Sequence, residues 1–191
     1  MPADIPPPAA PADLLKDAFG DVVLHVKEFA GETTIVVETE RINDVMRYVK
    51  STPGLFYNFL SDISAVDYFP SDYGDEYDGV EKNFRPERFG VAYHVYSMIY
   101  NRRLRIKTFA MEEEPIVPTV TDIWLNADWL EREIMDMMGV KFGGHPDPRR
   151  LLMPEDWDGH PHRRDYPLGY ETPMFSFNVD EIRKHKPFAE D

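Results

Sequence analysis

The sequence FGVAYHVYSMIY at residues 89–100 is followed, after Asn101 and Arg102, by RLRIKTFAM at residues 103–111. Both runs are rich in β-branched and aromatic residues, and two polar residues between such runs predict a β-hairpin. In the second run, charged and uncharged side chains alternate: Arg103, Arg105 and Lys107 against Leu104, Ile106 and Thr108. This period of two is typical of a strand with one face in the core and the other in solvent.

A second hairpin and a helix are predicted upstream. The runs VVLHVKEF (22–29) and TTIVVETE (33–40) are β-rich and are separated by Ala30 and Gly31. After Glu40, apolar residues recur at intervals of three and four: Ile42, Val45, Met46 and Val49. This spacing predicts a helix with one buried face, which Pro53 and Gly54 interrupt.

Shorter elements are expected around these. A short helix follows Asp13, with the sequence LLKDAFG, and ends at Gly20. LFYNFL (55–60) is expected to add a turn or two of helix in a new direction, and ISAVDYF (63–69) to form a strand. The stretch 71–87 is polar and acidic, which predicts a solvated loop rather than a calcium site, because it lacks the central glycine and closing glutamate of a calcium loop.

The sequence ADWLEREIMDMM at residues 127–138 predicts the last helix. Asn126 is a candidate N-cap, and Gly139 is suited to the left-handed residue that ends a helix. The expected buried stripe is apolar: Leu130, Ile134, Met137 and Met138. Asp128, Arg132 and Asp136 stand four apart along another side, where we expect a ladder of charges on the surface.

The composition excludes several classes of chemistry. The chain has 191 residues, of which 42% are apolar, and a formal net charge of −14. It has no Cys, so disulfides, thiolate nucleophiles and cysteine-held iron–sulfur clusters are excluded. The negative charge argues against nucleic acid as a partner, even with the basic face of 103–107, whose cations are expected to complement nearby acids or a partner. No signal peptide or membrane span is evident, which predicts a soluble intracellular protein.

We expect three regions along the chain. Residues 1–12 are rich in Pro and Ala and are predicted to be a disordered leader, and residues 13–140 to be the core domain. Residues 141–191 are predicted to be an extended tail that binds partners. The segment 141–170 is rich in Gly and Pro, yet it carries large aromatic and apolar side chains among four arginines. Such a segment needs a surface outside itself to hold it, and aromatic residues and Arg are the usual anchors of protein interfaces.

Few catalytic constellations are present. The sequence has no GxSxG, GxxxxGK, GxGxxG or HExxH motif. The best candidate is a metal site in the tail: His145, His160 and His162, with Asp147, Asp156 and Asp158 nearby in sequence. His160 and His162 are two residues apart, so in an extended chain they point to opposite sides. Hydrogen bonding that pins the chain to a neighbouring surface is therefore the favoured role of these histidines.

Residues 131–152, EREIMDMMGVKFGGHPDPRRLL, resemble the motif of the C subunit of the proton-pumping NADH:quinone oxidoreductase, respiratory complex I. The positions that match the motif are Glu131, Arg132, Glu133, Asp136, Met137, Met138, His145, Arg149, Leu151 and Leu152. The resemblance continues upstream from Pro118 to Trp124 and downstream, through MPEDWDGHPHRRDYPL, to Leu168.

The resemblance implies a fold, a role and partners. The implied fold is α+β, a mixed β-sheet with helices packed on it, followed by a long extended C-terminal tail. The implied role is a non-catalytic scaffold in the quinone module of the peripheral arm, with no cofactor in this chain and with FMN and iron–sulfur clusters in partner subunits. The implied partners are the quinone-site subunits B and D and the ferredoxin-like subunit I. The membrane is then reached only through the complex, on the cytoplasmic side of the cell membrane.

The candidate interface residues lie on the last helix and the tail: Glu131, Arg132, Glu133, Asp136, His145, Arg149, Arg150, Trp157, His160, Arg163, Arg164, Asp165 and Tyr166. Within the chain, we expect Glu131 or Glu133 to pair with a tail arginine. Two alternatives stay open: an equivalent adaptor in a membrane-bound hydrogenase-type complex, and a stand-alone metal-dependent enzyme that uses the tail histidines.

Overall fold

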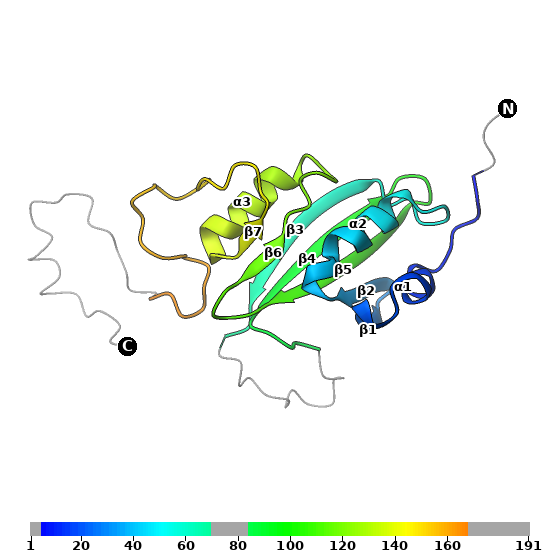
Figure 1. Ribbon diagram of the computed structural model, residues 1–191, viewed down its shortest axis with the longest axis horizontal. Helices are drawn as coiled ribbons and strands as arrows, with labels where there is room; N and C mark the ends of the chain where they lie inside the picture. Colours follow the sequence, from blue (N-terminus) through cyan, green and yellow to red (C-terminus); the bar gives the residue numbers. More distant parts are fainter. Residues whose placement is uncertain (1–4, 70–83, 168–191) are drawn as a thin grey trace, which may run out of the picture.

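The computed structural model describes residues 5–69 and 84–167 (Figure 1). The helices are α1 (Pro11–Phe19), α2 (Ile42–Ser51) and α3 (Ala127–Met138), with two 3-10 turns, η1 (Gly20–Val22) and η2 (Thr39–Arg41). The strands are β1 (Val23–Phe29), β2 (Glu32–Val37), β3 (Phe59–Asp67), β4 (Phe89–Ser97), β5 (Arg102–Ala110), β6 (Ile116–Pro118) and β7 (Lys141–Gly143). No helix in the described ranges has the length and apolarity needed to cross a bilayer.

The strands form a mixed sheet of five and a short ribbon. The order in the large sheet is β1-β2-β5-β4-β3, in which only the β2–β5 pairing is parallel. β6 and β7 form a separate parallel ribbon. Each of the three helices contributes to the buried core, through Leu15 of α1, Val45 of α2 and Ile134 of α3. The predicted α+β class, a mixed sheet with helices packed on it, is therefore confirmed.

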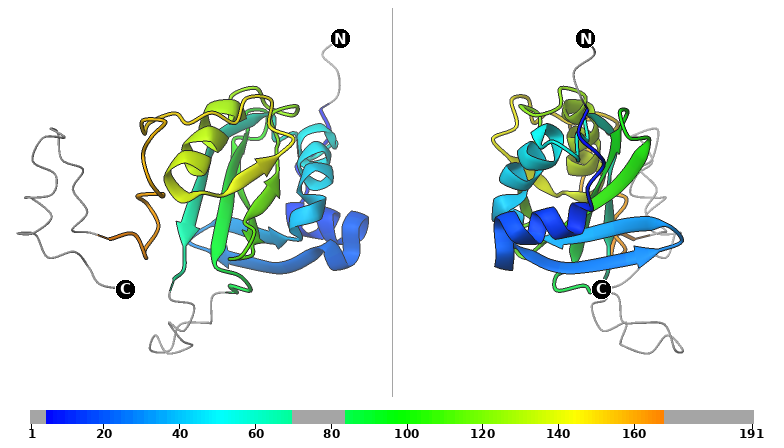
Figure 2. Two further views of the ribbon diagram at one scale, coloured as in Figure 1. Left: turned by 60° about the vertical axis from the view of Figure 1, so that its left-hand side comes forward. Right: turned by 90° about the vertical axis from the view of Figure 1, so that its right-hand side faces the viewer.

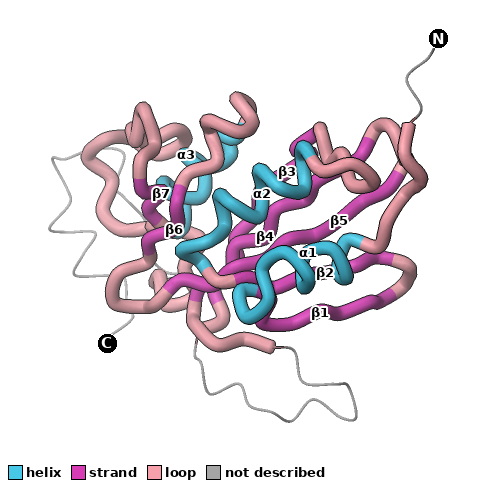
Figure 3. Tube along the Cα trace, turned by 45° about the vertical axis from the view of Figure 1, so that its right-hand side comes forward, coloured by secondary structure: helices cyan, strands magenta, loops and turns pink. Residues whose placement is uncertain are grey.

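The helices gather on one face of the large sheet. α1 and α2 lie together on one side of the strands in the right-hand view of Figure 2, and α3 lies beyond them near β3 (Figure 3). The alternation along β5 follows this layering, because Leu104 and Ile106 are buried while Arg103 is exposed. In the described part of the chain, the opposite face of the sheet has no helix over it. This open face carries the basic side chains of β5.

Most of the predicted elements are confirmed, with one clear error. Both hairpins form, and the four predicted apolar residues of α2 are all fully buried. The turn of helix expected at 55–60 is wrong, because β3 already begins at Phe59. Pro53 and Gly54 stop α2, and Phe56 adopts a positive φ of 44°, which a continuing helix does not allow. Leu60 then pairs with Val95 in the sheet.

The predicted limits of α3 are confirmed, but its cap and its buried face are not. Asn126 makes no side-chain cap, because its amide donates to the Leu60 carbonyl at 2.9 Å. The buried residues of α3 include three charged ones, Glu131, Arg132 and Asp136, whereas Leu130, Met137 and Met138 are only partly buried. The expected surface ladder of charges therefore lies largely inside the protein.

The predicted leader and acidic loop fall partly outside the described residues. Of the leader, residues 5–12 are described, and the last two of them, Pro11 and Ala12, already belong to α1. The Ala9 N–H donates to the Gly54 carbonyl at 3.0 Å. The Tyr100 hydroxyl donates to the Pro6 carbonyl at 2.7 Å, so this stretch lies against the domain. Residues 70–83, which hold most of the acidic loop, lie outside the described residues.

Candidate functional site

Asp136 on α3 organises the chain that follows the helix. Its side chain is buried, and its Oδ2 accepts three consecutive backbone N–H groups, those of Leu151, Leu152 and Met153, at 3.0, 2.7 and 2.8 Å. Arg150 donates to its Oδ1 at 3.1 Å. Burial would raise the pKa of Asp136, but the three N–H donors and Arg150 together bring it below its ordinary value. An ionised, buried carboxylate thus fixes an irregular segment that has no secondary structure of its own.

Arg132, one turn earlier on α3, holds the preceding residues of the same segment. Its guanidinium donates to the carbonyls of Arg149 and Arg150 at 3.0 and 3.3 Å and packs on the Trp129 ring, 5.4 Å from the ring centroid. Asp147 lies 3.7 Å from Arg132 and pairs with Arg149 through two hydrogen bonds of 2.6 Å. Residues 147–153, which we call the α3-bound segment, are therefore held by two successive turns of one helix.

The carboxyl end of α3 is covered by residues further along the tail. Arg163 donates to the Met138 carbonyl at 2.8 Å, and the His162 N–H donates to the Met137 carbonyl at 2.9 Å. His160 Nδ1 lies 2.8 Å from the Asp136 carbonyl. A cation at the last turn of a helix satisfies carbonyls that have no partner within the helix and complements the helix dipole.

Gly139 makes this approach possible. Its φ is +74°, and a Cβ built there would lie 2.5 Å from the His160 ring and 2.6 Å from Arg163. Any other residue at 139 would be strained and would displace the tail from the end of the helix. The predicted role of Gly139 as the helix-ending residue is confirmed, and the close contact adds a second reason for glycine there.

A second cluster holds the far end of the described tail. Arg88 and Asp67 form a buried pair through two hydrogen bonds, at 2.9 and 2.8 Å. Arg88 also reaches Asp165 at 2.8 Å and Glu112 at 2.6 Å, and the Arg164 N–H donates to Asp67 at 2.9 Å. Burial would raise the pKa of Asp67, but its hydrogen bonds to Arg88 and to the main chain lower it below its usual value.

Sequence reasoning missed Asp67 and Arg88. The available signal was an acidic residue inside the apolar run 63–69 and a basic residue immediately before the strand that begins at Phe89. A charge in such a place needs a buried partner of opposite sign, because an unpaired buried charge is strongly unfavourable.

The expected pairing of Glu131 or Glu133 with a tail arginine is wrong. Glu131 is fully buried and accepts the Thr119 hydroxyl at 2.5 Å and the Val120 N–H at 2.7 Å. Burial raises the pKa of Glu131 to about 7, although these two hydrogen bonds oppose the rise. Glu133 is exposed and makes no ion pair with any described residue. The helix carboxylate that meets a tail arginine is Asp136, which pairs with Arg150.

The three candidate histidines lie in different surroundings and do not form one site. His145 Nδ1 accepts the Asp147 N–H at 3.0 Å, so the neutral ring carries its proton on Nε2, which lies 3.2 Å from the Asp128 carbonyl. His145 Nε2 is also 3.9 Å from Glu131. His160 serves the end of α3, and His162 is exposed. Among residues 5–69 and 84–167, no group of three or more His, Asp or Glu side chains could hold a metal ion.

The remaining candidates lie on the outer part of the tail. Trp157 and Tyr166 are half-buried, and the Tyr166 hydroxyl donates to the Asp158 carbonyl at 3.4 Å. Arg149 and Arg164 are exposed. The structure thus brings Arg132, Asp136, Arg150, His160 and Arg163 together on α3, and separately joins Asp165 and the Arg164 main chain to Arg88 and Asp67.

The fold and this site define a class of protein: an α+β domain whose buried charges shape a long irregular segment on its own surface. A family model described as "Respiratory-chain NADH dehydrogenase, 30 Kd subunit" matches residues 35–172. The NADH-quinone oxidoreductase C subunit of Roseiflexus sp. (strain RS-1) is 42% identical over 177 residues, which cover 93% of this chain and 94% of the relative. The C subunit of the same enzyme in Geobacter sulfurreducens is 42% identical over 154 residues, covering 81% and 86%.

Solved structures agree with these relatives. A trypsin-resistant fragment (1–134) of Nqo5 is 33% identical with a TM-score of 0.58, and the match covers 71% of this chain and 97% of the fragment. A chain of the membrane-bound sulfane sulfur reductase, an archaeal respiratory membrane complex, has a TM-score of 0.63 at 20% identity, over 94% of each chain, which shows a shared fold. The chain belongs to the 30 kDa subunit family of respiratory-chain NADH dehydrogenase, and the resemblance of the 131–152 motif to this family is confirmed.

Proposed function

We propose that this chain is a non-catalytic scaffold subunit in the quinone module of the peripheral arm of a proton-translocating NADH:quinone oxidoreductase. Its family and the names of its relatives support this role. FMN and iron–sulfur clusters belong in this proposal to partner subunits, in keeping with a chain that has no Cys. The proposed partners are the quinone-site subunits B and D and the ferredoxin-like subunit I, and the proposed location is the cytoplasmic side of the cell membrane.

The observation that carries the scaffold role is the group of charged side chains on and around α3, which we call the Asp136 cluster: Arg132, Asp136, Arg150 and Arg163. Its charged groups form hydrogen bonds with the main chain of the α3-bound segment and with the end of the helix. These side chains therefore have a structural role: they hold the segment in one conformation. A segment ordered before it meets its partner loses less conformational entropy on binding. A buried charge network that holds a surface segment in advance is what a docking subunit needs.

The surface that this network presents contains exposed apolar side chains. Leu125 and Trp129, before and on α3, are 88% and 60% exposed, and Leu152 in the α3-bound segment is 59% exposed. Large apolar and aromatic side chains held on a rigid backbone are typical anchors of protein interfaces. The predicted tail, residues 141–191, begins with β7, whose Phe142 is buried in the core, so the proposed partner contacts start beyond Gly143.

A matched pair of substitutions tests this proposal. Leu152→Ser removes an exposed side chain, so we expect the isolated chain to keep its melting temperature, while its incorporation into the purified complex falls at least several-fold. Met111→Ser is the control, because Met111 is similarly exposed, at 56%, but lies at the end of β5. The readouts are the amount of this chain per complex and the NADH:quinone activity of the membranes. Full incorporation and activity of the Leu152 variant would exclude this surface as the docking site.

A further inference from the structure

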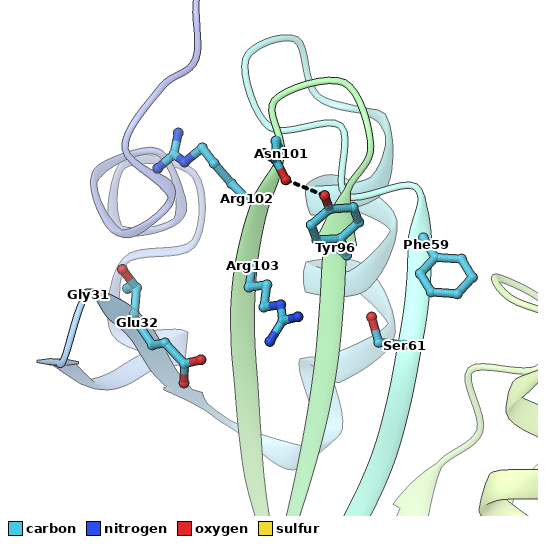
Figure 4. Close-up of a pocket in the computed structure, with 9 residues that line it drawn as sticks. Gly31, Glu32, Phe59, Ser61, Tyr96, Asn101, Arg102 and Arg103 are labelled. Atoms are coloured by element: carbon cyan, nitrogen blue, oxygen red, sulfur yellow. Dashed lines mark hydrogen bonds between the residues drawn. The ribbon is translucent and has the colours of Figure 1, made fainter.

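The open face of the large sheet contains a groove of about 560 Å³, which we call the sheet groove. It lies between the β1–β2 hairpin and β3, and β4 and β5 form its floor (Figure 4). Strands β3, β4 and β5 line it with Phe59, Ser61, Tyr96 and Arg103, and the hairpin lines it with Glu32. Neither α3 nor the described part of the tail, residues 141–167, contributes a lining residue, so the sheet groove is separate from the docking surface proposed above.

The sheet groove is basic in a strongly acidic protein. Arg103 is exposed and makes no hydrogen bond or ion pair with any described residue, although the chain carries a net charge of −14. Arg105, on the same face, already has a partner, because it donates to Glu32 at 3.0 Å. Lys107 follows on this face and donates to the Tyr68 hydroxyl at 2.5 Å. Of these three cations, Arg103 is thus the one that can pair with a group from outside the described structure.

Aromatic side chains lie beside this arginine in register. Phe59 pairs with Tyr96 across β3 and β4, and Tyr96 pairs with Arg103 across β4 and β5. The Tyr96 hydroxyl donates to Asn101, which fixes the ring, and Phe59 is 49% exposed. One cross-strand row therefore presents two aromatic rings and a guanidinium that has no partner among the described residues, and aromatic residues and Arg are enriched at protein interfaces.

We propose that the sheet groove docks an acidic segment of a partner subunit. A carboxylate of that segment pairs with Arg103 through two hydrogen bonds, and a neighbouring apolar side chain packs on Phe59 and Tyr96. This inference rests on the proposed function in one respect, because it requires that the chain has a partner subunit. A nucleic acid or an anionic membrane would also meet Arg103, but both are extended polyanions, which a protein of net charge −14 repels. One short segment with a carboxylate needs only the local positive charge.

A zero-length carbodiimide cross-link on the purified complex tests the proposal. The reagent joins an amine to a carboxylate only where the two are in contact. Arg103→Lys keeps the positive charge and adds an amine in the sheet groove, so we expect a cross-link from residue 103 to an Asp or Glu of another subunit. Arg41→Lys is the matched control, because Arg41 lies 2.7 Å from Asp44 at the start of α2, does not line the sheet groove and should give an internal link.

A charge reversal provides an independent measurement. Arg103→Glu should leave the melting temperature of the isolated chain unchanged, because the side chain is exposed, and should weaken its retention in the complex about ten-fold at raised salt. Arg103→Lys should restore most of this retention.

Three results would overturn the proposal. The first is an intact complex in which residue 103 links only to its own chain or to nothing while the control link forms. The second is Arg103-dependent sedimentation of the chain with phosphatidylglycerol vesicles, which would assign the groove to an anionic membrane surface. The third is recovery of the chain outside any multi-subunit complex, which would overturn the proposed function as well. An intact complex without the cross-link overturns this inference alone.

Discussion

Glu131 is a fully buried carboxyl group that forms no ion pair with a described Lys or Arg, and its nearest basic side chain is the His145 ring, whose Nε2 lies 3.9 Å away. Its oxygens accept the Thr119 hydroxyl and the Val120 N–H, and in this way Glu131 joins α3 to the loop before it. Burial raises its pKa from 4.5 to about 7, so the folded chain binds a proton that the unfolded chain releases. The stability due to this group is fully present below pH 4.5 and is lost as the pH rises to about 7.

Glu131→Gln tests this titration. Gln keeps the shape of the neutral acid and cannot ionise, so between pH 4.5 and 7 the variant should gain stability relative to the original chain by roughly 1 kcal/mol per pH unit. Denaturant unfolding at several pH values measures the difference, with the exposed Glu133→Gln as control. Parallel pH profiles for the Glu131 variant and the original chain would show that Glu131 does not titrate in this range.

At the scale of the element, α3 serves two surfaces at once. Glu131 and Ile134 face the domain, and Arg132 and Asp136 hold the α3-bound segment. A helix turns by about 100° per residue, so Glu131 and Asp136, five residues apart, point to different sides. The helix is thus a bridge between the core and the segment that we propose as a docking surface.

Asp136→Asn should weaken this bridge. The variant loses the charge that three N–H groups and Arg150 share, and its amide donor faces N–H groups, so we expect a loss of about 2–4 kcal/mol in the free energy of unfolding near pH 7. The loss should shrink as the pH falls below 3.8, the ordinary pKa, because the lowered folded-state pKa gives stability only while Asp136 is ionised. Chemical unfolding measures both effects. A change below about 0.5 kcal/mol at pH 7 is the expectation for a surface site and would contradict the buried network.

At the scale of the whole molecule, the Arg88 cluster closes the described tail back onto the large sheet. Arg88 joins the end of β3, through Asp67, to Asp165, which is far away in sequence. Phe69 and Phe89 pack on its guanidinium, and the Arg88 side chain is only 5% exposed. The described tail is therefore tied to its own domain along α3 and at the end of β3.

Asp165→Asn should loosen the second tie. Asp165 is part-exposed and Arg88 keeps its other partners, so we expect a modest effect: trypsin cleavage after Arg163 or Arg164 becomes about two- to five-fold faster. Asp156→Asn is the control, because Asp156 is exposed and lies outside the cluster. Mass spectrometry of the early fragments gives the rates. Equal rates in the two variants would mean that the Arg88–Asp165 contact contributes nothing to holding the tail.

Much of the architecture could be predicted from local pattern. The alternation in 103–111 and the three-four spacing of 42–49 fix which side of each element is apolar, and burial of that side follows from the hydrophobic effect. The 131–152 motif indicated the family. These conclusions needed no knowledge of which segments meet, because period and motif are properties of neighbouring residues.

Only the tertiary structure decided which charges meet. Glu131, Glu133 and Asp136 are alike in the sequence, but the side of α3 that faces the domain buries Glu131 against Thr119 and leaves Asp136 to take Arg150. Arg88 and Asp67 became a pair because the sheet register brings the ends of β3 and β4 together. Contacts between distant residues depend on the packing of whole elements, and periodicity within one element carries no information about its neighbours.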